Sequence, residues 1–250
     1  MLTEERQAII MELLEAKGII RIQELVEILN TSESTVRRDL SYLEKKKLLK
    51  RIHGGASLLK QKREEPSMLE KAATNLSAKK RIASYAASLI QNGDCIYIDA
   101  GTTTLQMIDY IIAKDVTIVT NGIPHLDPLT EKGFMVYATG GFVKPKTKAM
   151  VGLGAIEGLK KYRFDKTFLG VNGIHLEYGF TTPDPEEAAV KRTAMELGQK
   201  VFVLADDSKF NEVTFAQIAP LEDAVIITNS EAEEVIEEYR TITKIEVVKS

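Results

Sequence analysis

Apolar and polar positions along residues 1–58 repeat with the spacing of three short helices. In the third segment Val36, Leu40 and Leu43 recur at intervals of four and three residues, which places them on one face of a helix. Two short apolar and basic runs follow, separated by a Gly-Gly pair of the kind that tight hairpin turns favour. The pattern predicts helix, helix, turn, helix and hairpin.

A polar stretch separates this pattern from a different one. Residues 59–74 are polar, contain a proline and are expected to form an inter-domain linker. Residues 75–250 then alternate helical spacing with six short, nearly continuous apolar runs: CIYID, VTIVT, FMVYA, KTFLGV, KVFVLA and AVIIT. Such runs are typical of a parallel sheet buried on both faces. We therefore expect an α/β domain with a ligand at the carboxyl ends of its strands.

Composition narrows the class of protein. With 44% hydrophobic and 28% charged residues among 250, the chain has the make-up of a soluble globular protein of about two domains. No apolar run approaches the ~20 residues of a membrane span, and the N-terminus lacks a signal-peptide core. Cys95, the single cysteine, excludes an internal disulfide and is expected to pack in a core strand. We expect a cytoplasmic protein without membrane contact, metal or cofactor.

Positive charge is concentrated in one segment, although the formal net charge is −3. Residues 34–63 hold ten basic and two acidic side chains. A charge run is usually just a solvated face, but this one coincides with the helix and hairpin pattern. The combination predicts a winged helix-turn-helix domain that binds double-stranded DNA. The alternative is a small helical interaction module with a charged surface.

The third helix is expected to enter the major groove, and the hairpin to lie over phosphates or an adjacent minor groove. Arginine can pair bidentately with guanine or clamp a phosphate, and small hydroxyl side chains allow close approach. The expected DNA-binding residues are Ser34, Thr35, Arg37, Arg38 and Ser41 of the helix and Lys50, Arg51 and His53 of the hairpin. Whether Arg37 or Arg38 contacts a base is left open.

The segment LVEILNTSESTVRRDLSYLEKKKLLKRIHGGA closely resembles the DNA-binding signature of the DeoR family of bacterial transcriptional regulators. The Arg37–Leu40 core and the Lys50–Ala56 wing match that signature in place. The resemblance implies a regulator of operator DNA, most often a repressor, that acts as a homodimer or homotetramer. The whole chain is also similar to regulators of fructose- or hexose-phosphotransferase operons.

Small and polar residues follow the predicted strands. In CIYIDAGTTTLQMI, Gly101 permits a turn, and three threonines stand beside free backbone N–H groups at a helix start. That arrangement binds phosphate, while the alternative is a capped turn and nothing more. The other strand ends carry Thr120, Asn121 and Gly122, then Gly140 and Gly141, then Asn172 and Gly173, and finally Lys209. Their convergence predicts a pocket for a polar, anionic small molecule.

This half also resembles the DeoR family, whose sensor domain is similar in fold to ribose-5-phosphate isomerase and glucosamine-6-phosphate deaminase. The resemblance implies a phosphorylated sugar as effector. The phosphate would bind the loop of Asp99, Gly101, Thr102, Thr103 and Thr104, and the pocket would be lined by Glu187, Lys191 and Lys209. Glu186 remains an alternative to Glu187.

A sugar-phosphate isomerase is the alternative from another class. Its chemistry needs a carboxylate base and an electrophile, roles that Glu187 and Lys209 could nominally fill. The related isomerases, however, carry Asp-Gly-Ala-Asp where this chain has Val171–Ile174. Because an asparagine cannot act as a base, we expect no enzymatic activity. His125 and His175 are expected at the surface or pocket rim. A third hypothesis is a scaffold that acts through protein partners, but it would leave the basic segment unexplained.

Overall fold

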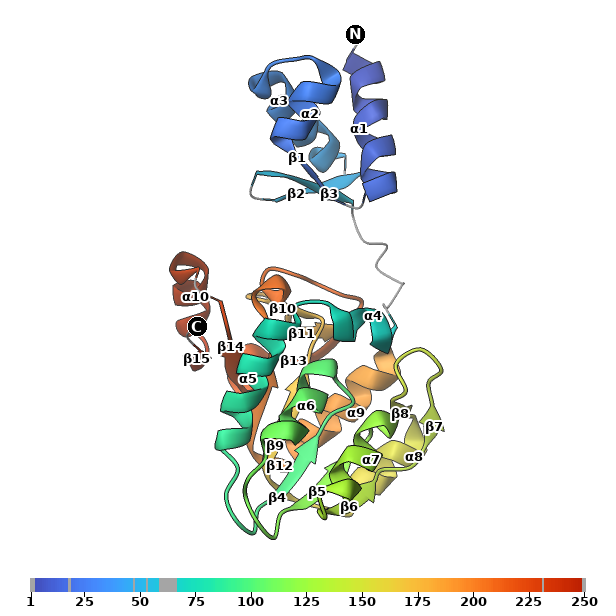
Figure 1. The fold of residues 1–250 in the computed structure, drawn as a ribbon, viewed down its shortest axis with the longest axis vertical. Coiled ribbons are helices and arrows are strands. Elements are labelled where there is room, and N and C mark those ends of the chain that lie inside the picture. Colours follow the sequence, from blue (N-terminus) through green and yellow to red (C-terminus); the bar gives the residue numbers. More distant parts are fainter. Residues whose placement is uncertain are drawn as a thin grey trace. The chain divides into compact units, whose positions relative to one another are not determined.

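The computed structural model describes residues 3–17, 19–46, 48–52, 54–58, 67–230 and 232–248. The chain divides into two compact units, residues 1–64 and 65–250 (Figure 1). Of the predicted linker, residues 59–66 lie outside the described residues. Its remaining part contains helix α4 (Met68–Ala73), which begins with a capping box formed by Ser67 and Glu70 and lies in the second unit.

The first unit has the predicted order of three helices and a hairpin. Its elements are α1 (Thr3–Lys17), β1 (Ile19–Arg21), α2 (Ile22–Leu29), α3 (Glu33–Lys45), β2 (Leu49–Ile52) and β3 (Gly55–Leu58). Val36, Leu40 and Leu43 are buried as predicted, in one core with residues of α1 and α2. The pattern predicted no strand between the first two helices, but β1 lies there and pairs antiparallel with β3. The wing is thus a three-stranded sheet in the order β1-β3-β2.

A buried ion pair joins the first helix to the third. Arg6 of α1 donates to both carboxylate oxygens of Asp39, at 2.6 Å from Nε and 3.1 Å from Nη2. Asp39 lies on the buried side of α3 with 2% of its surface exposed. Bidentate geometry of this kind fixes orientation as well as distance, so the pair sets how α3 lies on α1.

The second unit is built around a parallel sheet. Its helices are α4, α5 (Leu76–Ser88), α6 (Thr102–Met107), α7 (Ile123–Glu131), α8 (Leu153–Leu159), α9 (Pro185–Glu196) and α10 (Glu233–Arg240), with single 3-10 turns η1 (Ile108–Tyr110), η2 (Asp207–Lys209) and η3 (Leu221–Asp223). Its strands are β4 (Cys95–Ile98), β5 (Thr117–Thr120), β6 (Met135–Ala138), β7 (Phe142–Val143), β8 (Met150–Val151), β9 (Phe164–Gly170), β10 (Gly173–His175), β11 (Gly179–Thr182), β12 (Gly198–Leu204), β13 (Ala216–Ala219), β14 (Val225–Thr228) and β15 (Ile245–Val247).

The strand order of the large sheet locates its binding edge. The seven strands run β15-β14-β12-β9-β4-β5-β6, and each neighbouring pair is parallel. From β4 the chain first moves outward through β5 and β6, and then returns to the other side of β4 with β9. The order therefore reverses between β4 and β9. In open parallel sheets a crevice forms outside the carboxyl ends at such a switch point.

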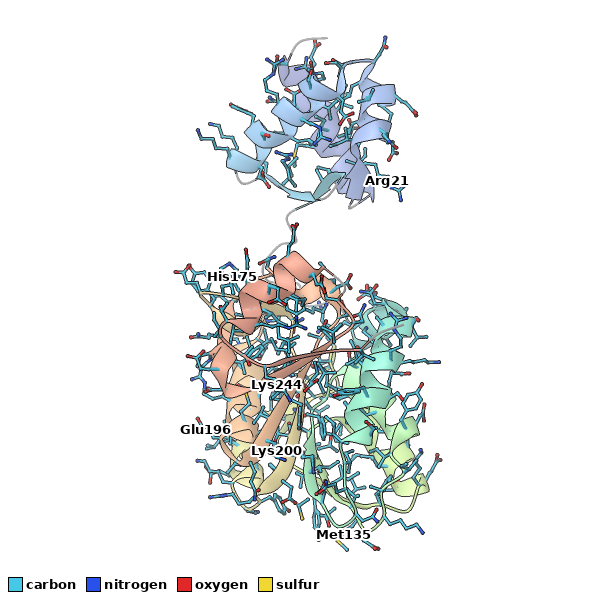
Figure 2. All side chains as sticks on the ribbon, turned by 90° about the vertical axis from the view of Figure 1, so that its left-hand side faces the viewer. Arg21, Met135, His175, Glu196, Lys200 and Lys244 are labelled. Carbon is cyan, nitrogen blue, oxygen red and sulfur yellow. The ribbon has the colours of Figure 1, made fainter. Side chains whose placement is uncertain are left out.

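Alternate residues of each strand enter two separate cores. Ile96 and Ile98 pack with α5, η1 and α7 on one face, whereas Tyr97 packs with α8, α9 and α10 on the other (Figure 1). Burial on both faces explains why these strands are nearly continuous apolar runs. Figure 2 shows His175 and Met135 at opposite ends of this unit, which are the carboxyl and amino ends of the sheet.

Several features of this unit were not predicted. All six apolar runs are strands, but β15 adds a seventh to the sheet. Strands β10, β11 and β13 form a small antiparallel sheet, and β7 and β8 form a hairpin. Cys95 was predicted to pack in the core, and this is wrong: it begins β4 with its side chain exposed.

We predict that Gly158→Ala destabilises the second unit. Alanine favours a helix over glycine by ~1 kcal/mol, but a Cβ at this position of α8 would overlap the carbonyl oxygen of Thr139. The loop after β6 would have to shift, at a net cost of about 2 kcal/mol. Urea unfolding of the full chain measures this. An increase in the free energy of unfolding would show that the close approach of Gly158 to the Thr139 carbonyl oxygen does not disfavour a side chain at position 158.

Candidate functional site

The third helix presents a polar face away from its buried stripe. Ser32 caps the helix by accepting a hydrogen bond from the Thr35 backbone N–H at 3.3 Å. The predicted residues Ser34, Arg37, Arg38 and Ser41 are exposed, and Thr35 is half-buried. Arg37 is held by Glu33 one turn earlier, with 2.8 Å from Nε to Oε1. The helix therefore exposes two arginines, of which Arg37 must leave Glu33 before it pairs with another group.

One side chain of the wing is anchored on this helix. Arg51 Nη1 donates to Ser41 Oγ at 2.9 Å, and Ser41 Oγ donates to the Arg37 carbonyl at 2.8 Å. The Arg51 backbone N–H also donates to Glu44 Oε1 at 2.8 Å. These bonds hold β2 against α3, so Ser41 and Arg51 position the helix and wing relative to each other. The Lys50 side chain and His53, both predicted to contact DNA, lie outside the described residues.

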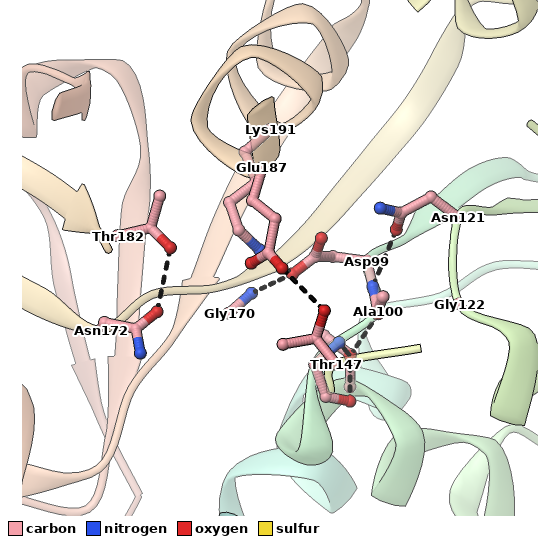
Figure 3. Close-up of polar contacts among 12 residues, drawn as sticks. Asp99, Ala100, Asn121, Gly122, Thr147, Gly170, Asn172, Thr182, Glu187 and Lys191 are labelled. Carbon is pink, nitrogen blue, oxygen red and sulfur yellow. Dashed lines mark hydrogen bonds and ion pairs between the residues drawn. The ribbon is translucent and has the colours of Figure 1, made fainter. Parts of the chain in front are cut away.

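At the switch point of the second unit, Asp99 joins three elements (Figure 3). It follows β4, and its Oδ2 accepts from Lys191 Nζ of α9 and, at 3.1 Å, from the Gly170 N–H at the end of β9. The carboxylate is 1% exposed, and its other oxygen has no hydrogen-bond partner among the described residues. Asp99 thus ties β4, β9 and α9 together at the crevice while keeping one acceptor unused.

Glu187 occupies the same edge, one helical turn before Lys191. It is buried, and its Oε1 accepts from Lys144 Nζ at 2.8 Å. The same oxygen accepts from Thr147 Oγ1 at 2.8 Å (Figure 3). Lys144 also pairs with Asp184, the N-cap of α9, at 2.9 Å. We name Asp99, Lys144, Thr147, Asp184, Glu187 and Lys191 the acid–lysine cluster. Glu186 is exposed, so of the two predicted alternatives only Glu187 joins the cluster.

The charges of the cluster control the ionisation of its acids. Burial favours the neutral form of Glu187, but the nearby ammonium groups and the Thr147 hydroxyl outweigh it, so the pKa of Glu187 is lowered. Burial likewise opposes the charge on Asp184. Backbone N–H groups at the start of α9 and the Lys144 ammonium overcome that effect and lower the pKa of Asp184. Both acids are therefore carboxylates at neutral pH.

The predicted phosphate loop is closed by its own hydrogen bonds. Thr104 is buried, and its hydroxyl donates to the Asp99 carbonyl at 2.5 Å and accepts from the Gly101 N–H at 3.0 Å. Thr102 and Thr103 begin α6, the first half-buried and the second buried. Thr104 therefore acts as an internal brace, so Thr102 and Thr103 carry the other two hydroxyls of the predicted phosphate loop.

Asn121 holds that loop from the neighbouring strand. Its Oδ1 accepts from the Ala100 N–H at 2.9 Å (Figure 3). The same oxygen accepts from Tyr97 OH at 2.8 Å, and Nδ2 donates to the Met150 carbonyl at 3.1 Å. Asn121 is 2% exposed. Its side chain orients the site, because each of its polar atoms already has a partner in the protein.

His125 was predicted at the surface or pocket rim, and this is wrong. It is fully buried in α7, with Nε2 3.4 Å from Thr104 Oγ1. Burial lowers the pKa of His125 to about 3, so the ring is neutral. A Cβ at Gly122 would overlap this ring. Gly122 is thus required by the close packing of His125 behind the loop.

The remaining predicted residues are spread around the same edge. A Cβ at Gly141 would meet the Val151 carbonyl, and one at Gly173 would meet the Glu212 carbonyl, so both glycines permit close backbone packing. Asn172 accepts from Thr182 Oγ1 at 3.1 Å. Thr120 accepts from the Gly122 N–H, Gly140 has a positive φ, and Lys209 ends η2. The structure brings Asp99, Glu187 and Lys191 together and places Lys209 in a separate group beside Asp206.

Lys144, Thr147 and Asp184 were missed. Lys144 and Thr147 belong to the run KPKTK between β7 and β8. The signal that could have identified them is that these basic residues directly follow a strand. Asp184 precedes Pro185, and Asp followed by Pro marks a helix start.

Within the described residues no helix is long and apolar enough to cross a membrane. No group of His, Cys, Asp and Glu side chains in that same part of the chain is arranged to hold a metal ion.

We predict that Lys144→Met destabilises the second unit by about 2 kcal/mol at pH 7, because Glu187 and Asp184 each lose a charged donor. Both acids have lowered pKa values, so the stability that they gain from Lys144 is present above their ordinary pKa and is lost as pH falls. The deficit should therefore shrink towards pH 4. Urea unfolding at several pH values measures it.

The matched control is Lys160→Met, which removes an exposed lysine paired with Glu157. Exposed pairs contribute roughly 0–1 kcal/mol. Equal losses in the two variants, or a loss for Lys144→Met that is independent of pH, would contradict the role given to Lys144.

Two family models match the chain. The DeoR-like helix-turn-helix domain matches residues 6–62, and the DeoR C terminal sensor domain matches residues 74–230. Between them they cover most of each unit, including α3 and the whole acid–lysine cluster.

Full-length relatives agree with these matches. The chain is 50% identical over 250 residues to the uncharacterized HTH-type transcriptional regulator FruR of Bacillus subtilis (strain 168), with 100% of both chains covered. It is 34% identical to the transcriptional repressor AccR of Agrobacterium fabrum, over 94% of this chain and 93% of that one. A ribose 5-phosphate isomerase from Plasmodium falciparum is similar in structure at 17% identity, covering 54% of this chain and 52% of that one with a TM-score of 0.40. The chain belongs to the DeoR family of transcriptional regulators, with a helix-turn-helix domain for DNA and a C-terminal sensor domain.

Proposed function

We propose that this regulator represses a sugar-metabolism operon and leaves its operator when a phosphorylated sugar binds the sensor unit. The observation that carries the proposal is the acid–lysine cluster at the switch point between β4 and β9. Buried carboxylates that are held charged by lysines accept hydrogen bonds from sugar hydroxyls, and the unused oxygen of Asp99 is one such acceptor.

The first unit would contact the operator in two ways. Arg37 and Arg38 on the exposed face of α3 would reach base edges or phosphates in the major groove, with Ser34 and Thr35 at the start of the helix allowing close approach. The basic wing would add salt-dependent affinity for phosphates. Two such units in a homodimer or homotetramer would bind half-sites spaced by ~10 bp or a multiple of it.

A hydrogen-bonded path leads from the effector site to the linker. Lys144 and Thr147 lie on the connection between β7 and β8, and the Lys146 carbonyl in that connection accepts from the Met68 N–H at 3.2 Å. Met68 begins α4, which lies within the C-terminal part of the predicted linker. A ligand that changed the partners of Lys144 would therefore pull on the start of α4. If the two arrangements of the protein differ ~100-fold in effector affinity, ~2.7 kcal/mol per site is available to release the operator.

We predict that Arg38→Ala and Arg37→Ala each weaken operator binding without unfolding the protein, because both side chains are exposed on α3. A lost base contact costs about 1–3 kcal/mol, that is, roughly 5- to 150-fold in affinity. Gel mobility shifts with the operator upstream of the gene's own transcription unit measure this. The control is Lys200→Ala, which changes an exposed lysine of the second unit (Figure 2). Unchanged binding in both arginine variants would remove α3 as the reading helix.

We predict that one compound in a panel of fructose and glucose phosphates raises the unfolding temperature of the full chain and releases operator DNA, whereas the unphosphorylated sugars do neither. Lys209→Ala should weaken that response and leave operator affinity unchanged, since the residue lies in the second unit. Differential scanning fluorimetry and a mobility-shift titration measure the two effects. If no phosphorylated sugar acts, the effector half of the proposal is wrong. An unaltered titration for Lys209→Ala would take that lysine out of the site.

A further inference from the structure

Lys79 of α5 is a buried cation with few partners. Its side chain belongs to a residue that is 6% exposed, and within the described residues its ammonium group makes one hydrogen bond, to the backbone carbonyl of Lys71. An ammonium group has three N–H donors. Burial of a charge without an ion-pair partner is costly, so an anion beside this ammonium group would lower that cost.

The surroundings of Lys79 carry an excess of positive charge. Asp206, Lys209 and Lys71 are the charged groups that act on it, and burial together with the two lysines lowers the pKa of Lys79, while Asp206 opposes that effect. We name Lys71, Lys79, Asp206 and Lys209 the lysine cluster. With three lysines and one carboxylate its formal charge is +2. In the acid–lysine cluster three acids face two lysines, which gives −1.

Asp206, the one carboxylate of the lysine cluster, also connects two elements. Its Oδ1 already accepts from Asn75 Nδ2 at 3.2 Å and from the Ser208 N–H at 3.0 Å. These bonds connect the start of α5 to η2, which follows β12 on the carboxyl side of the large sheet. The lysine cluster therefore lies at the same end of the unit as the acid–lysine cluster, and it is assembled from α4, α5 and η2.

We propose that Lys79 binds the phosphate group of the effector, together with Lys209. The proposal rests on the proposed function and assigns the two ends of the ligand. The phosphate dianion enters the lysine cluster, where it supplies the acceptors that Lys79 lacks. The hydroxyl-bearing end faces the acid–lysine cluster, whose net negative charge would repel a phosphate. The lysine cluster would thus distinguish a phosphorylated sugar from a free one.

A structural role for Lys79 makes a different prediction. If the ammonium served only to hold the Lys71 carbonyl and hence α4, its replacement would lower stability and leave phosphate affinity unchanged. Lys79→Gln separates the two roles, because an amide keeps a donor for that carbonyl but removes the charge. The matched control is Lys80→Gln, one residue further along α5, where the lysine is exposed.

The experiment uses the full chain and measures binding by calorimetry at a temperature where every variant is folded. The probes are inorganic phosphate, the panel of hexose phosphates and the same sugars without phosphate. Because it lacks a charged hydrogen bond, the Lys79→Gln variant should bind the phosphate compounds about 10- to 100-fold more weakly than the wild type does. Lys80→Gln should bind like the wild type. The unfolding temperature of Lys79→Gln without ligand should be unchanged or raised, because a poorly paired buried charge is gone.

Each other outcome counts against the proposal in a distinct way. Wild-type affinity of Lys79→Gln for the phosphate compounds would overturn the role of Lys79 and leave the proposed function standing. An equal loss in Lys80→Gln would show that the effect is only a general reduction of positive charge. If the wild-type protein binds none of the phosphate compounds, the proposed function fails, and the role of Lys79 fails with it.

Discussion

The reversal of strand order between β4 and β9 is the constraint on which the sensor unit depends. Because consecutive strands leave β4 in opposite directions, their following loops diverge, and the backbone itself leaves an opening at this one place. Asp99 occupies that place and is bonded to both sides of it, to Gly170 on β9 and to Lys191 on α9. Glu187 lies one turn away on the same helix, so the site residues are gathered by topology.

The cluster at this opening is assembled from pairs that satisfy one another. Lys144 pairs with both Asp184 and Glu187, and Lys191 pairs with Asp99. Such pairs are nearly neutral to stability as a whole, but each member becomes costly if its partner is removed. Under the proposed function, a ligand could therefore exchange partners at little net cost, and the exchange would act on the β7–β8 connection that carries Lys144. This is the property that a sensor needs and that a rigid catalytic site would avoid.

Much of the fold was predictable because it follows from local periodicity. Burial on one face of a helix or on both faces of a sheet is visible in the spacing of apolar residues within a single segment. Examples are the stripe of Val36, Leu40 and Leu43 and the six apolar runs. Features that depend on distant partners were not predictable. Strand β1 looks like a link until β3 lies beside it, and His125 looks like a loop residue until α7 closes behind Thr104.

The same distinction separates the site residues that were predicted from those that were missed. Glu187 and Lys191 stand on one face of one helix, and Asp99 follows a recognisable strand. Lys144 reaches the site only through a hairpin whose register cannot be read from two apolar residues per strand. Lys79 has no sequence signature at all, because nothing in its neighbours along the chain shows that its ammonium group will be buried.

The Arg6–Asp39 pair has a consequence for redesign of the DNA-reading helix. Recognition helices are attractive as exchangeable cassettes, in which a new set of exposed residues is grafted onto an existing scaffold. Here the exposed residues cannot be exchanged alone, because Asp39 on the buried side of α3 and Arg6 of α1 together hold the orientation of α3. A donor helix that lacks an acid at position 39 would leave Arg6 without its partner and would lie at a different angle. A transplant between such regulators should therefore move the acid and its arginine as one unit.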